Sequence, residues 1–274
     1  MVVKRLLAGF VTIMLLLVML GYVTATEDVN ITADIVKYNS KTGETVATGN
    51  VKITRGSLIA TCLKAIANMN NSNVHLVGNV YAKDKTTEMW AKEAFYYGRK
   101  KVLKIFGSVK VVHKGYTLYA DVVRYFMRSK GKRKYIATGS PAYILQEGAK
   151  LSGKQIEFEN NVITVSGGVS YVGKKGNFTV TGDDAVATIG KGDKVEKVHI
   201  NGNVHALKVS KDSRFEAWSD DLVYSANSRT ILLTGNPKVK QGKRLLLADK
   251  IEYNLDTEEM KAFGKARIVL PSGK

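Results

Sequence analysis

Eight glycines recur along most of the chain at intervals of 28 to 35 residues. They are Gly49, Gly78, Gly107, Gly139, Gly167, Gly202, Gly235 and Gly264. A period of this size is the signature of a repeat protein, in which each unit buries its apolar face only against its neighbours. The positions two and four residues to either side of the glycines, which include Pro141 and Tyr143, are apolar in 29 of 32 cases. The odd-numbered positions are mostly polar, so this alternation predicts half-buried strands with a glycine at the middle of the dry face, where it bends the strand.

A second predicted strand precedes each glycine strand and begins at a small residue. The small residues are Ala33, Cys62, Ala91, Ala120, Gly153, Gly182, Ser219 and Ala248. In five units the next residue is aspartate: Asp34, Asp121, Asp183, Asp220 and Asp249. Eight units of two strands predict an all-β stack of about 16 antiparallel strands with no helix. Because no unit can bury its dry face alone, residues 26–274 are expected to form one elongated domain.

The first 25 residues have the features of a signal peptide. Lys4 and Arg5 precede an apolar run from Leu6 to Leu20, and Val23-Thr24-Ala25 provides small residues for cleavage before Thr26. The alternative is an uncleaved membrane anchor, since Leu6 to Val23 spans 18 residues, near the lower limit for a bilayer-spanning helix. In both cases the remainder of the chain is exported.

The formal net charge of +18 indicates an anionic partner, and +16 remains when Lys4 and Arg5 are removed. Export argues against nucleic acid as that partner. The turns after the glycine strands all carry basic residues, and in a regular stack they line one rim. The alternative is that these charges have no ligand, because turns are exposed to solvent and commonly carry charged residues. Solubility alone, however, needs a net charge of only about 2–8. The predicted anionic-headgroup residues of this rim are Lys83, Lys85, Lys114, Lys174, Lys175, Lys208 and Lys211.

No catalytic or metal-binding motif emerges, so we expect neither an enzyme nor a cofactor. The repeated aspartates are better explained as hydrogen-bond acceptors in turns than as acid–base pairs, because an enzyme site occurs once. His199 and His205 lie six residues apart on one strand, about 20 Å, which is too far for shared metal coordination. The lone Cys62 fills a small-residue position and behaves as a small hydrophobe.

The run Ala33-Asp34-Ile35-Val36-Lys37-Tyr38-Asn39, followed by Ala47-Thr48-Gly49-Asn50-Val51, resembles the OstA-like (LptA) family of periplasmic lipopolysaccharide-transport proteins. The pattern recurs at Ala248–Asn254 with Ala262-Phe263-Gly264, and the similarity covers about residues 30–270. The resemblance implies a twisted, V-shaped β-jellyroll whose apolar groove holds the acyl chains of lipid A. It also implies a periplasmic bridge between the two membranes, joined to like domains, or to further copies of itself, by pairing of the edge strands near Val29–Ile31 and Ile268–Leu270.

The resemblance assigns the dry-face residues to the lining of this groove. They are Val51, Ile53, Leu76, Val80, Ile105, Val109, Val111, Val165, Val169, Ile200, Val204 and Leu233.

Four other interpretations remain open at this stage. An uncleaved N-terminus would make the protein an inner-membrane-anchored jellyroll of the same export machinery. Alternating strands behind a signal peptide also suit an outer-membrane β-barrel pore, although a lipid-facing surface should not carry a glycine in every second strand. A β-solenoid that acts on polysaccharides could have a similar period but would need a clustered acid–base set. A structural envelope scaffold that binds no lipid is the fourth.

Overall fold

The computed structural model describes residues 29–68, 70–113, 115–127, 133–174, 178–190, 195–209 and 214–270. These residues form an all-β structure, and none of them lies in an α-helix. The strands join into one sheet of 22 strands, and the pairings with a defined register are all antiparallel. The predicted all-β class and antiparallel stacking are therefore confirmed. A β-solenoid, which is built from parallel coils, does not fit the described part of the chain.

The strands follow one another along the chain. They are β1 (Asn30–Thr32), β2 (Ile35–Asn39), β3 (Glu44–Arg55), β4 (Leu58–Asn68), β5 (Asn73–Lys83), β6 (Thr87–Tyr97), β7 (Val102–His113), β8 (Tyr116–Met127), β9 (Arg133–Gln146), β10 (Ala149–Glu159), β11 (Val162–Ser166), β12 (Val169–Val172), β13 (Phe178–Gly182), β14 (Asp184–Ile189), β15 (Val195–Val209), β16 (Arg214–Ser225), β17 (Thr230–Thr234), β18 (Lys238–Gln241), β19 (Arg244–Leu247), β20 (Lys250–Asn254), β21 (Met260–Phe263) and β22 (Arg267–Val269).

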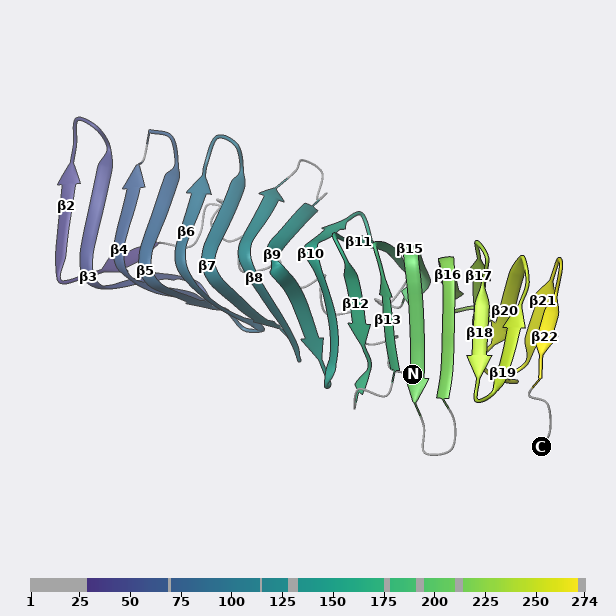
Figure 1. Cartoon of the computed structure of the whole chain (residues 1–274). Helices are drawn as coiled ribbons and strands as arrows, with labels where there is room; N and C mark the ends of the chain where they lie inside the picture. The colour runs from purple at the N-terminus through teal and green to yellow at the C-terminus, as the bar shows by residue number, and fades with distance from the viewer. Residues whose placement is uncertain are drawn as a thin grey trace. The chain divides into compact units, whose positions relative to one another are not determined.

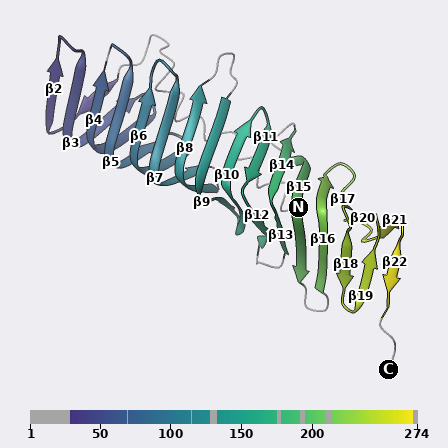
Figure 2. The same cartoon turned by 45° about the horizontal axis from the view of Figure 1, so that its top comes forward.

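The chain divides by its internal contacts into two compact units. The N-terminal unit holds the described residues up to Ala142 together with 157–160, and the C-terminal unit holds 143–156 and the residues from 161 onward. Within the N-terminal unit, Figures 1 and 2 show β2 to β8 side by side in chain order. Neighbours in sequence are therefore neighbours in space, as in a meander of hairpins.

Each long strand bends at its repeat glycine. In β3, Gly49 and Asn50 both have positive φ (78° and 45°), and together they lie opposite the single residue Leu63 of β4. This is a β-bulge: one strand has an extra residue, and the local bend increases. Glycine adopts such a φ without the penalty that a Cβ atom would bring. The predicted bend is confirmed, and the bent strands are visible in Figure 1.

The bend divides each repeat into two layers, which we call arm A and arm B. Arm A contains the half-strands before the repeat glycine and their partners, such as Glu44–Thr48 paired with β2. Arm B contains the half-strands after it, such as Lys52–Thr54 paired with β1. The C-terminal unit repeats the arrangement, because β15 pairs with β14 before Gly202 and with β13 after it.

The expected number of about 16 strands is too low because six of those strands are broken at the bend. The breaks lie between β1 and β2, β11 and β12, β13 and β14, β17 and β18, β19 and β20, and β21 and β22. At each break the backbone ladder is interrupted at the repeat glycine or at the opposing small residue. Alternation of side chains continues through the break, so the sequence pattern does not reveal it.

The core lies on the inward faces of the two arms. In the N-terminal unit, Ile105 and Val109 flank the bend of β7, and each is 1% exposed. The Tyr125 and Tyr135 rings stack with centroids 4.8 Å apart. In the fourth repeat, the inward residues after the glycine are Ala142 and Ile144, whereas the expected Pro141 is exposed and Tyr143 is only half-buried. The register of that repeat is thus shifted by one residue relative to the others.

Candidate functional site

All twelve predicted groove-lining residues lie in the buried interior, with exposed fractions of 1–8%. Seven belong to the N-terminal unit, from Val51 to Val111, and five to the C-terminal unit, from Val165 to Leu233. In β3 the buried face continues on both sides of the bend, because Ala47 on arm A and the predicted Val51 on arm B are each 1% exposed. The period-2 pattern therefore identified the inward face correctly, while binding of lipid by these residues stays a prediction.

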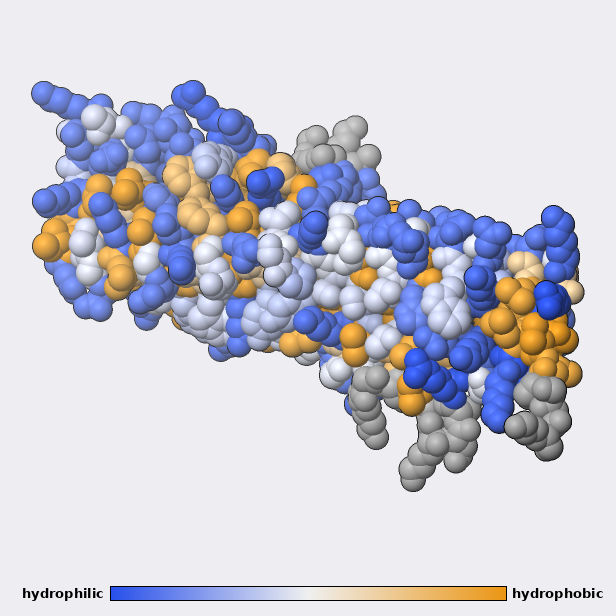
Figure 3. All heavy atoms as spheres, in the orientation of Figure 1, coloured by the Kyte–Doolittle hydropathy of each residue, from blue (hydrophilic) through white to orange (hydrophobic). Residues whose placement is uncertain are grey.

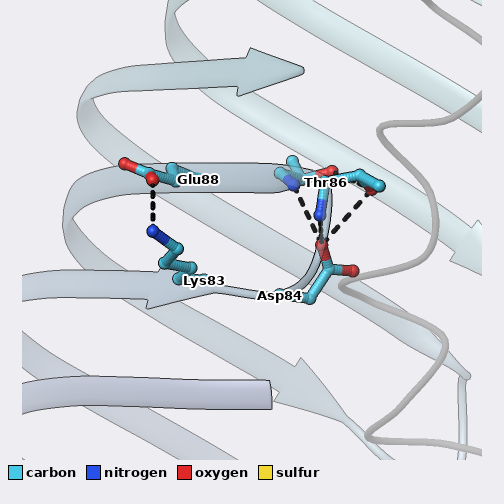
Figure 4. A network of polar contacts seen from close by, with 5 residues as sticks. Lys83, Asp84, Thr86 and Glu88 are labelled. Carbon is cyan, nitrogen blue, oxygen red and sulfur yellow. Dashed lines mark hydrogen bonds and ion pairs between the residues drawn. The ribbon is translucent and has the colours of Figure 1, made fainter. Parts of the chain in front are cut away.

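A row of buried polar residues lies at the turns where arm B ends. Asp84 is 7% exposed, and its carboxylate accepts hydrogen bonds from the backbone N–H groups of Thr86 (2.8 Å) and Thr87 (2.9 Å). Figure 4 shows this network together with the ion pair between Lys83 and Glu88 (2.8 Å). The Thr87 hydroxyl lies 2.7 Å from Nδ1 of His113, which is fully buried. The inward face of arm B is thus apolar near the bend and polar at the rim.

The predicted basic rim is partly described. Lys83 at the end of β5 and Lys85 in the following turn are exposed, and Lys174 and Lys208 are exposed in the C-terminal unit. Lys114, Lys175 and Lys211 lie outside the described residues. The hydrogen bond and charge of Glu88 raise the pKa of the Lys83 ammonium, so this residue is positive at neutral pH. The described lysines are accessible to an anion from solvent.

Aromatic residues occupy the opposite rim of the N-terminal unit. Tyr96, Tyr125, Tyr135 and Phe158 are all less than 8% exposed. The Tyr135 and Phe158 ring centroids are 6.1 Å apart, and burial raises the pKa of the Tyr96 hydroxyl. The interior of this unit therefore lies between a polar rim on arm B and an aromatic rim on arm A.

The repeated aspartates serve the bend. Asp34 accepts a hydrogen bond from the Asn50 side chain (3.1 Å), and Asp183 accepts one from Asn203 (3.0 Å). The backbone N–H of Asp34 also donates to the Gly49 carbonyl (2.9 Å). A Cβ atom on Gly49 would lie 2.2 Å from the Asp34 carboxylate, so the aspartate occupies the space that the glycine leaves. The acceptor role is as expected, but the donors are asparagine side chains of the bulge.

The other candidate residues form separate surface pairs. His199 lies 2.8 Å from Asp221, and His205 lies 2.9 Å from Glu216. Among the residues that the structure describes, no three His, Cys, Asp or Glu side chains gather as a metal site. Cys62 is 5% exposed, its thiol donates to the Lys64 carbonyl (3.2 Å), and burial raises its pKa.

Both ends of the sheet expose apolar residues. The N-terminal unit ends at β2, where Val36 and Tyr38 are 52% and 63% exposed although their partners in β3 belong to the inward face. The C-terminal unit ends at β22, where Ile268 is 57% exposed. In the described part of the chain, no helix is long and apolar enough to cross a membrane. The predicted signal peptide or anchor, residues 1–25, lies outside that part.

Strands bent at a glycine bulge, stacked by antiparallel pairing and apolar inside, define a repetitive β-jellyroll. The family of LptA and the LptD N-terminal domain, described as lipopolysaccharide transport proteins, matches residues 30–131 and 152–259. The chain belongs to this family, whose shared activity is transport rather than catalysis. This confirms the resemblance noted in the sequence.

Two further comparisons add little. No curated protein matches. Among solved structures, LptH of Pseudomonas aeruginosa, the LptA-homologous periplasmic component of the lipopolysaccharide transport device, is similar over 90% of this chain and 96% of its own. The identity is 11% and the TM-score 0.22, so the assignment rests on the family match alone.

Proposed function

We propose that this protein carries lipopolysaccharide through the periplasm with the acyl chains held between arm A and arm B. The observation that carries the proposal is the apolar inward face within each unit, to which seven predicted residues contribute in the N-terminal unit and five in the C-terminal unit. Transfer of an acyl chain from water to such a face is favourable by about 0.8 kcal/mol per CH₂ group. A lipid with several chains is therefore held strongly without any single dominant contact.

In this proposal the glycolipid phosphates lie at the rim of arm B. The described lysines of this rim are exposed, and ammonium groups pair with phosphate oxygens through charge-assisted hydrogen bonds. The polar row behind them, from Asp84 to His113, makes this end of the interior suitable for a headgroup rather than for hydrocarbon. The opposite, aromatic rim is suited to the acyl chains.

We further propose that the open edges join the protein to other jellyroll subunits between the inner and outer membranes. The exposed Val36 and Tyr38 would continue the interior into a partner, and unpaired backbone groups of an edge strand favour strand addition. A Val36→Lys variant would place a charge in that joint, and it should reduce head-to-tail assembly in light scattering at high protein concentration.

Photocrosslinking in cells tests the lipid site. A photoreactive residue at Val109 or Val165 should capture lipopolysaccharide, because both side chains face inward. Matched controls at the adjacent outward positions Lys110 and Thr164 should capture little. Equal labelling at inward and outward positions would overturn the proposed site. Intact mass of the exported protein decides between a cleaved bridge and the anchored component, because cleavage after Ala25 removes the apolar segment.

A further inference from the structure

The outward face of arm A in the N-terminal unit is unusually apolar for a surface that faces solvent. Cross-strand pairing places its residues in two lines over β2 to β8. We call the apolar residues of these lines, together with the neighbouring Leu63, the arm A patch. It consists of Ile35, Val46, Leu63, Ile66, Val77, Phe95, Phe106 and Val122.

Solvent reaches this patch. Ile35 and Leu63 are 56% and 55% exposed, and the other members are half-buried. Figure 3 shows hydrophobic residues gathered on the N-terminal part of this face, where Figure 1 places β2 to β8. Most solvent-facing strand positions elsewhere in the chain are polar. Contiguous exposed apolar patches are typical of interaction sites. Leu63 is notable because five of the eight repeats carry aspartate at the equivalent position.

Basic residues are interspersed in the same two lines. They are Lys37, Lys64, Lys104 and Arg124. The Lys104 ammonium lies 5.3 Å from the Phe106 ring centroid, so a charge and an apolar surface are presented together. The acidic residue in the two lines is Glu93, which pairs with His75 at 2.9 Å. At the position of Leu63 the other repeats of this unit carry Asp34, Lys92 and Asp121, so basic residues still outnumber acidic ones on this face.

The equivalent face of the C-terminal unit lacks this excess of positive charge. The equivalent two lines contain two lysines, Lys250 and Lys261, and three acidic residues, Asp184, Asp221 and Glu252. Lys197 lies on the next line of the same face, farther from the bend. The difference between the units gives an internal control, because the fold and strand geometry are shared while the charge balance is not.

We propose that the arm A patch docks on the surface of a bilayer that contains anionic phospholipid. Apolar side chains enter the boundary between headgroups and acyl chains, and lysine and arginine contact the phosphates, as in interfacial helices. The long basic side chains can extend to the headgroups while their methylene groups cover the apolar surface. A carbohydrate partner fits less well, because most of the patch is aliphatic and offers sugars no hydrogen bonds. This site lies on the opposite side of arm A from the proposed acyl-chain interior.

Vesicle sedimentation tests the proposal with the chain that begins at Thr26. The 22 strands of the described residues lie between Asn30 and Val269, and omission of residues 1–25 removes an apolar segment that would itself bind lipid. The protein should sediment with vesicles of phosphatidylcholine containing 30% phosphatidylglycerol but not with pure phosphatidylcholine. The Lys64→Gln/Arg124→Gln variant should bind about 25-fold more weakly, since each basic residue near an anionic surface contributes about fivefold.

The matched control is Lys197→Gln/Lys261→Gln, which removes the same charge from the C-terminal face and should bind like the parent. A Leu63→Ser variant should weaken binding at constant charge. Absence of vesicle binding by the parent, or equal loss in the two charge variants, would overturn the proposal. Lipopolysaccharide capture at Val109 should be unchanged in Lys64→Gln/Arg124→Gln, so failure of membrane docking and failure of lipid carriage are separately visible.

Discussion

Substitution of the repeat glycine in β7 tests whether the bend depends on packing as well as on backbone conformation. Gly107 has φ of 84°, and a Cβ atom placed on it would lie 2.6 Å from Cβ of Lys92. Gly115, in the turn after the same strand, has nearly the same φ of 86°, yet a Cβ atom there meets nothing within 4 Å. The two glycines therefore share the conformational cost of alanine and differ in the steric cost.

The expected magnitudes follow from this difference. Alanine in the left-handed region costs about 1–2 kcal/mol at either position. At Gly107 the contact with Lys92 involves a Cβ atom, which a side-chain rotation cannot move, so an overpacking cost of about 1–3 kcal/mol is added. Gly107→Ala should thus destabilise the protein by about 2–5 kcal/mol, and Gly115→Ala by about 1–2 kcal/mol.

Urea unfolding of the two variants and the parent provides the measurement. All three carry Trp218→Phe, so that the fluorescence comes from Trp90 and reports on the N-terminal unit, while circular dichroism reports on both units. Equal losses for Gly107→Ala and Gly115→Ala would refute the steric part of the reasoning. The glycine would then be required for its φ angle alone.

Three further predictions concern single interactions. Asn50→Ala should destabilise the protein by about 1–2 kcal/mol in urea unfolding, because it removes the hydrogen bond to Asp34 and places alanine at φ 45°. Asn50→Gly removes the hydrogen bond alone, so a loss for Asn50→Ala no larger than that for Asn50→Gly would contradict this. Ile105→Ala should lower the free energy of unfolding by about 2–5 kcal/mol in the same assay, because the side chain is 1% exposed and its removal leaves a cavity. A decrease below 1 kcal/mol would mean that the two arms move together and fill the cavity. The hydrogen bond from His205 lowers the pKa of Glu216 below 4.5, so the stability that this pair adds is present above pH 4.5 and is lost as the pH falls through the folded-state pKa. Parent and Glu216→Gln melting temperatures should therefore differ at pH 6 and converge as the pH falls through the folded-state pKa, and a difference that persists in acid would exclude ionisation of this carboxyl as its source.

Several features of the fold were predictable because they depend on local geometry. Side chains alternate with a period of two in any strand, so the inward positions such as Val51 and Ile105 could be identified without knowledge of their partners. A glycine that recurs within such a pattern indicates a bend, and the positive φ at Gly49 confirms it. The asparagine that follows was missed, although Gly-Asn occurs at Gly49, Gly78, Gly202 and Gly235 and was a visible signal for two successive left-handed residues.

The features of the site that were missed depend on register. His113 directly precedes Lys114 of the predicted basic rim, but pairing of β6 with β7 places it opposite Thr87 inside the rim. The six additional strand breaks also escaped notice, because a break in backbone pairing leaves the side-chain alternation unchanged.

The sequence by itself determined the class of structure, the positions of the bends and the inward face, since each is a property of a few consecutive residues. Only the tertiary structure decided which residues meet across strands: Asp34 with Asn50, Lys83 with Glu88, and the gathering of Val46, Ile66 and Phe106 on one outward face. The physical reason is that cross-strand neighbours are set by the hydrogen-bond register between different strands, and a shift of one residue at a bend changes every partner beyond it.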